Sequence, residues 1–115
     1  MKERSAIRER YLRDEVRIRI GGLAANLARV KSFSNHFGHR DVVESLVEES
    51  KFFIEWAAPD AGPELQLRLI EPQLQLARWQ LAWSSIWADA AQRDRVADEA
   101  QAWSTDLPRL AGLLR

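Results

Sequence analysis

Apolar residues in the first quarter of the chain recur at intervals of three and four positions. This spacing is typical of one face of a helix, and it predicts a long helix from about residue 3 to about residue 33. Gly21 and Gly22 fall inside that helix, although a glycine there costs about 1 kcal/mol relative to alanine. We expect a neighbouring helix to cross closely at this point, and a kink is the alternative. The recurring apolar residues are Leu12, Val16, Ile20, Leu23, Leu27 and Val30.

Two stretches rich in turn-forming residues divide the rest of the chain. The sequence SFSNHFGHRD interrupts the helical pattern first, and APDAGP, with two prolines and a glycine, interrupts it again. The apolar spacing between them predicts a second helix at about 41–57, and that after them a third at about 64–88. Pro72 lies inside the third helix and should bend it, because proline has no backbone N–H to donate.

The end of the chain predicts a fourth helix and a short tail. Asp89, followed three residues later by Gln92, indicates a helix N-terminus at which the aspartate caps free backbone N–H groups. We expect the fourth helix at about 90–104 and a C-terminal tail at 105–115. No alternation typical of strands is visible. The sequence therefore predicts an all-α fold: a single four-helix bundle-like domain over 1–115, with a long N-terminal helix and a Pro-kinked central third helix.

The predicted third helix is apolar on two separate strips. A helix that is apolar so far around its circumference needs neighbours on several sides. It therefore lies either at the centre of the bundle or against another subunit. One strip contains Leu67, Ile70, Leu74, Ala77 and Leu81, and the other contains Leu65, Leu69, Leu76, Trp79, Trp83 and Trp87.

Composition limits the class of protein more than its activity. The 115 residues contain no cysteine, which excludes disulfides and thiolate metal sites and favours a cytoplasmic protein. No run of about 18 apolar residues or signal-like segment is present, so we expect neither secretion nor a membrane span. Seventeen basic residues balance seventeen acidic ones, but the bases gather in the predicted first helix and the acids in the second. Pairing between these two helices explains this distribution without an external partner.

Aromatic residues are the most unusual feature of the composition. Three of the five tryptophans, Trp79, Trp83 and Trp87, are spaced four apart and form one slanting ridge on the predicted third helix. Phe52 and Trp56 have the same spacing and flank an acidic strip of the second helix. All five are candidates for an interface, since tryptophan is favoured at the centre of protein interfaces. For the ridge we place a core within the monomer first and a subunit or partner interface second, and a pocket for a pigment or another apolar ligand is the third alternative.

Candidate catalytic and metal-binding residues are few. His36 and His39 are the only histidines, and with nearby carboxylates they could ligate zinc or nickel, but loop histidines more often cap helices or face water. The serines lie in helical patterns without an exposed glycine-flanked turn, and a phosphate-binding glycine loop is absent. We therefore expect neither an enzyme nor a cofactor.

The basic first helix raises the alternative of a nucleic-acid-binding protein. Arginines could neutralise phosphates with salt-dependent affinity, although acids are interleaved with them and no recognition motif follows. We expect these arginines to lie in solvent or to face acidic residues. The candidates for anion contacts are Arg4, Arg8, Arg10, Arg13 and Arg17, with Arg19 in the same polar segment.

The segments FFIEWAAPDA and LARWQLAWSSIWAD, with the leucine- and glutamine-rich helix between them, resemble small helical proteins of cyanobacteria over about residues 33–103. The resemblance implies a cytoplasmic protein without a catalytic role, and it brings no activity. Together with the apolar helix faces, it favours a non-catalytic interaction or adaptor module. We expect a homodimer that associates through these faces, or another protein as the partner.

Overall fold

The backbone of residues 2–112 is described by the computed structural model, with side chains from residue 4 onward. These residues form six α-helices and two short 3-10 helices, and no strand occurs among them, which confirms the all-α prediction. None of these helices is both long and apolar enough to cross a membrane. In chain order the elements are α1 (Lys2–Arg13), α2 (Val16–Phe33), η1 (Phe37–His39), α3 (Arg40–Ala57), η2 (Ala58–Asp60), α4 (Pro63–Leu81), α5 (Trp83–Ala88) and α6 (Ala90–Leu110).

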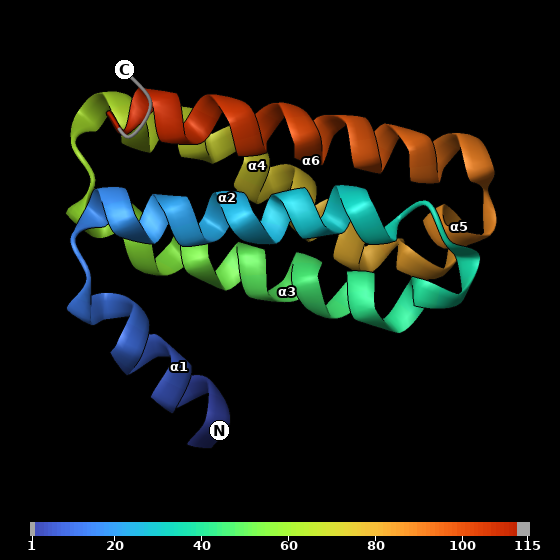
Figure 1. Cartoon of the computed structure of the whole chain (residues 1–115), viewed down its shortest axis with the longest axis horizontal. Helices are drawn as coiled ribbons and strands as arrows, with labels where there is room; N and C mark the ends of the chain where they lie inside the picture. Colours follow the sequence, from blue (N-terminus) through green and yellow to red (C-terminus); the bar gives the residue numbers. More distant parts are fainter. Residues whose placement is uncertain (1, 113–115) are drawn as a thin grey trace.

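The helix most covered by its neighbours is α2, which lies between α3 and α6 (Figure 1). Its apolar residues have the three-and-four spacing that the sequence showed, and four of them, Ile20, Leu23, Leu27 and Val30, are fully buried. Helix α4 packs against α3, and more sparsely against α6, and it crosses behind α2 in the view of Figure 1. The expectation that the third predicted helix is the central one is therefore wrong, and α2 has that position.

The predicted N-terminal helix is two helices, because the chain turns at Asp14 and Glu15. Glu15 adopts an extended conformation (φ −63°, ψ 155°). The turn lets Tyr11 stack on Phe53 of α3, with ring centroids 4.2 Å apart. The glycines do not break α2. The expected close neighbour at this point is α1. A Cβ at Gly22 would lie 3.7 Å from the Tyr11 ring, an ordinary van der Waals distance, so the approach does not require glycine.

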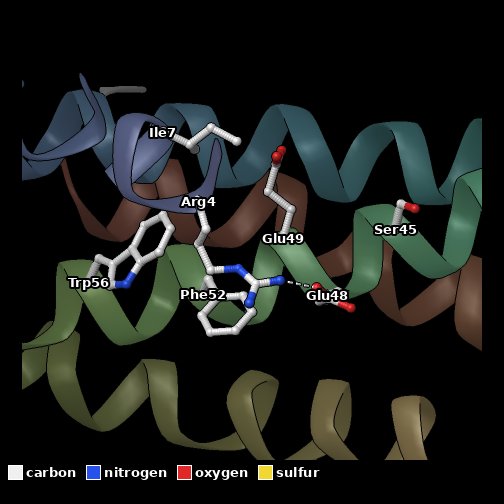
Figure 2. Close-up of a pocket in the computed structure, with 7 residues that line it drawn as sticks. All are labelled: Arg4, Ile7, Ser45, Glu48, Glu49, Phe52 and Trp56. Carbon is white, nitrogen blue, oxygen red and sulfur yellow. Dashed lines mark hydrogen bonds and ion pairs between the residues drawn. The ribbon is translucent and has the colours of Figure 1, made fainter. Parts of the chain in front are cut away.

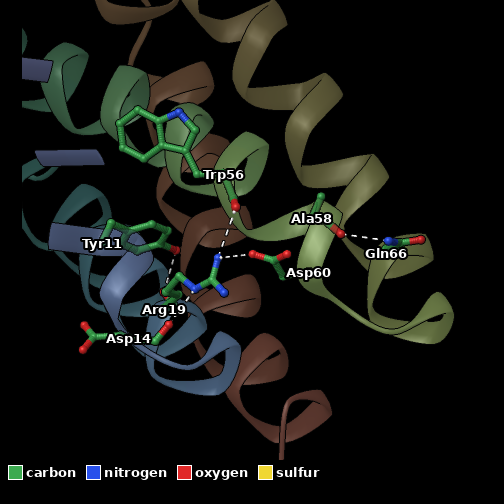
Figure 3. A network of polar contacts seen from close by, with 7 residues as sticks. All are labelled: Tyr11, Asp14, Arg19, Trp56, Ala58, Asp60 and Gln66. Atoms are coloured by element: carbon green, nitrogen blue, oxygen red, sulfur yellow. Dashed lines mark hydrogen bonds and ion pairs between the residues drawn. The ribbon is translucent and has the colours of Figure 1, made fainter. Parts of the chain in front are cut away.

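A buried arginine fixes this turn to the rest of the fold (Figure 3). Only 6% of Arg19 is exposed, although the sequence placed it in a solvated polar segment. Its Nε donates to the carbonyl of Asp14 (3.0 Å), and its Nη1 donates to the carbonyl of Trp56 (3.2 Å) and to Asp60 Oδ2 (3.0 Å). The Tyr11 hydroxyl donates to the Arg19 carbonyl at 2.7 Å. One guanidinium thus joins the end of α1, the start of α2 and the α3–η2 corner.

The other predicted helices lie where the sequence placed them, but two of them end at different residues than predicted. Helix α3 covers the predicted second helix, whereas the predicted third helix ends at Leu81, and α5 follows it in a new direction after Ala82. Pro72 is buried inside α4 and does not break it. Helix α6 extends beyond the predicted end at residue 104 and includes Pro108. As predicted, Asp89 caps α6, and its side chain accepts hydrogen bonds from the backbone N–H groups of Ala91 and Gln92.

Candidate interaction surface

Helix α4 has two apolar strips on opposite sides. The inner strip, Leu69, Pro72, Leu76 and Trp79, is buried. The outer strip is Leu67, Ile70, Leu74, Ala77 and Leu81. Both strips follow a three-and-four spacing, and their offset of two residues corresponds to about 200° around the helix. Because α3 and α6 cover the inner strip, the outer strip faces away from the bundle.

The exposed fractions of the outer strip are high for aliphatic side chains. They are 70% for Leu67, 51% for Ile70, 54% for Leu74 and 91% for Leu81, and Ala77 is half-buried. Single exposed leucines are common on protein surfaces, whereas a continuous apolar row at helical spacing is consistent with a partner interface. From Leu67 to Leu81 this row is about 21 Å long.

Different polar residues border the outer strip on its two sides. Glu71 and Arg78 are exposed on one flank. The other flank has Gln66, Gln73 and Gln80 at seven-residue intervals. Gln66 Nε2 donates to the Ala58 carbonyl at 2.8 Å, and Gln80 Nε2 lies 3.5 Å from a Glu48 carboxylate oxygen, so this flank lies toward α3. An apolar seam with polar borders that repeat every seven residues is the pattern of a helix that pairs with another helix.

The tryptophan ridge lies in the core of the chain. The exposed fractions of Trp79, Trp83 and Trp87 are 5%, 2% and 1%. The Trp83 indole N–H donates to the Arg40 carbonyl (3.2 Å) and the Trp87 indole N–H donates to the Phe37 carbonyl (2.7 Å). Trp79 stacks on Trp103 of α6 with ring centroids 5.4 Å apart. These three residues are therefore covered by the chain itself and are not part of an exposed surface in this fold.

Phe52 and Trp56 line a pocket of about 220 Å³ between α1 and α3 (Figure 2). Both are half-buried. The Arg4 guanidinium lies 4.1 Å from the centre of the Phe52 ring and forms an ion pair with Glu48. A ring face beside a carboxylate suits a cation, and here a side chain of α1 supplies that cation. These contacts and the Tyr11–Phe53 stack hold α1 against α3.

The arginines proposed for anion contacts do not form one surface. The turn at Asp14 and Glu15 separates Arg17 from the other four, which are on α1. Arg4 is paired with Glu48, and Arg17 lies 3.3 Å from Glu15. Arg8, Arg10 and Arg13 are exposed.

The two histidines lie side by side at η1. Their ring centroids are 4.7 Å apart. His36 Nδ1 accepts a hydrogen bond from the Gly38 N–H and so caps η1, and His39 Nδ1 lies 3.2 Å from the Phe33 carbonyl oxygen. No group of three or more His, Asp or Glu side chains suited to a metal ion occurs in the part of the chain that the structure describes.

The sequence identified both strips of α4 but left open whether the bundle or another subunit covers them. The signal that could have singled out the outer strip is the seven-residue repeat of its glutamine border, together with the absence of tryptophan from it. Comparison with known proteins adds no further assignment: no protein-family model, curated protein or solved structure matches this chain.

Proposed function

We propose that this protein is a non-catalytic protein–protein interaction module that pairs with a second copy of itself through the outer strip of α4. The observation that carries the proposal is the exposure of four large aliphatic side chains in one row, on a helix whose opposite side is buried. Helix-face recognition of this kind requires no reacting group, since apolar area and shape supply the affinity.

The energy available from the outer strip fits a reversible dimer. The exposed parts of its four large side chains equal between two and three fully exposed ones. At about 1.5–3 kcal/mol for each buried side chain, two copies would gain roughly 8–16 kcal/mol. Association costs about 4–15 kcal/mol. The gain exceeds the cost by up to about 12 kcal/mol, and a micromolar dissociation constant, which needs a net gain of about 8 kcal/mol, lies within this range.

The test compares two substitutions that exchange an exposed aliphatic side chain for glutamine. Leu74→Gln changes the middle of the outer strip, and Val42→Gln is the matched control on α3, where the valine is 46% exposed. Sedimentation equilibrium should give a dimer for the unchanged chain and for Val42→Gln, and a monomer for Leu74→Gln at the same micromolar concentration. Equal association of all three chains would show that the outer strip is not the interface.

A further inference from the structure

We infer that the two α4 helices of this dimer run antiparallel, with Glu71 of each copy facing Arg78 of the partner subunit. The inference rests on the proposed function and adds orientation and register to it. It follows from the two polar flanks of the outer strip, which differ in charge and would meet different residues in a parallel and in an antiparallel pair.

The outer strip has the spacing of a coiled-coil seam. In a seven-residue repeat labelled a to g, Leu67, Leu74 and Leu81 occupy a, and Ile70 and Ala77 occupy d. Glu71 and Arg78 then occupy successive e positions, and the three border glutamines occupy successive g positions. Pro72 and Trp79 fall at f, on the side away from the seam, which agrees with their burial in the bundle.

Orientation decides which flanks meet. In a parallel pair the e positions of one helix lie beside the g positions of the other, so Glu71 and Arg78 would meet only glutamines. In an antiparallel pair, e positions lie beside e positions and g beside g. The charged flanks then face each other, and charge complementarity between them favours this orientation.

Among the antiparallel registers, one places every charged e residue opposite a residue of opposite charge on the partner subunit. With Leu74 packed opposite Ala77 of the partner subunit, Glu71 faces the partner's Arg78, and symmetry repeats the pair on the other side of the two-fold axis. Sliding one helix by a single heptad would place Glu71 opposite the partner's Glu71, or Arg78 opposite the partner's Arg78. Like charges in such positions are unfavourable, so the same two residues that favour this register disfavour its neighbours.

The apolar layers of this register also fit in size. The layers at the two-fold axis each combine a leucine, Leu74, with the small Ala77 of the partner subunit, which allows the helices to approach closely. The outer layers combine Ile70 with the partner's Leu81, the most exposed residue of the strip, and Leu67 lies beyond them at the end of the paired segment. On the second flank, Gln73 meets the partner's Gln80, and two amides can donate to and accept from each other.

The experiment uses charge reversal in the full-length chain. Glu71→Arg places arginines opposite each other across the interface, and Arg78→Glu does the same with glutamates. Each variant alone should dimerise about tenfold more weakly than the unchanged chain at low salt, since exposed charge pairs contribute modestly and two pairs change sign. An equimolar mixture should recover the affinity as a heterodimer, in which every pair is again opposite in charge. Arg68→Glu is the control, because this exposed residue lies away from both borders of the strip.

The outcomes separate this inference from the proposed function. Weakening by both single reversals, recovery in the mixture and no effect of Arg68→Glu would support the antiparallel register. If Leu74→Gln abolishes the dimer but the reversals leave its affinity unchanged, the interface stands and the antiparallel register is wrong. If the unchanged chain stays monomeric up to about 1 mM, both are wrong.

Discussion

The two-sided character of α4 predicts opposite results for two leucines that are two residues apart. Leu76, on the inner strip, is fully buried, whereas Leu74, on the outer strip, is 54% exposed. Truncation of a buried leucine to alanine removes its transfer free energy and leaves a cavity, which together cost about 2–5 kcal/mol. Truncation of Leu74 opens no cavity in the monomer and removes about half of a transfer term of about 1.5–3 kcal/mol. The higher helix propensity of alanine offsets a few tenths of a kcal/mol of this loss.

We therefore expect Leu76→Ala to lower the free energy of unfolding by about 3 kcal/mol and Leu74→Ala by about 1 kcal/mol or less. The assay is urea denaturation followed by tryptophan fluorescence, at a concentration low enough that the dimer does not contribute. At high concentration Leu74→Ala should lose additional stability relative to the unchanged chain, because its dimer is weaker. An equal cost for the two variants in the dilute monomer would refute the assignment of inner and outer strips.

Three further predictions concern the turn between α1 and α2 and the start of α6. Burial raises the pKa of Tyr11, although the charge of Arg19 opposes this. The stability that the buried, neutral Tyr11 gives the fold is therefore complete below about pH 10, and it is lost as the pH rises toward the raised pKa. The chain has one tyrosine, so tyrosinate absorbance should appear only with alkaline unfolding, and titration near pH 10 in the folded state would contradict this. Arg19→Lys should lower the free energy of unfolding by about 1–3 kcal/mol, because one ammonium cannot reproduce the three separate hydrogen bonds of the guanidinium. An unchanged midpoint of urea denaturation would contradict the role of that network. Hydrogen bonding by the Gln92 side chain, and then by backbone N–H groups, lowers the pKa of Asp89. The stabilisation that the Asp89 carboxylate gives is therefore present above about pH 4 and is lost as the pH falls through the lowered pKa. Asp89→Asn should make the melting temperature depend less on pH in this acid range, and an unchanged pH dependence would contradict the capping role.

The helices could be predicted because their apolar spacing is local information. The turn at Asp14 and Glu15 could not, because charged residues there suit a helix as well as a turn. What selects the turn is the stacking of Tyr11 on Phe53 and the reach of Arg19 to Asp60, and these partners are about 40 residues away along the chain. The two-glycine segment is the more obvious weak point, but it remains helical within α2, and Gly22 lies beside Tyr11 of α1.

The sequence predicted the residues of the candidate surface but not their exposure. The spacing identified two apolar strips on one helix, but it could not determine which strip the bundle would cover. That depends on how α3 and α6 pack around α4. Tryptophan is favoured at interfaces, which made Trp83 and Trp87 interface candidates. Their indole N–H groups instead donate to the carbonyls of Arg40 and Phe37, which lie more than 40 residues earlier in the chain. Aliphatic residues without polar atoms form the exposed strip instead.

The most direct test of the central claim is the mass of the unchanged chain in solution as a function of concentration. If the outer strip of α4 is an interface between two copies, the mass should rise from 13.2 kDa toward twice that value as the concentration passes through the micromolar range, and it should level off there because a two-fold interface is closed. A mass that stays at 13.2 kDa up to about 1 mM would contradict the claim.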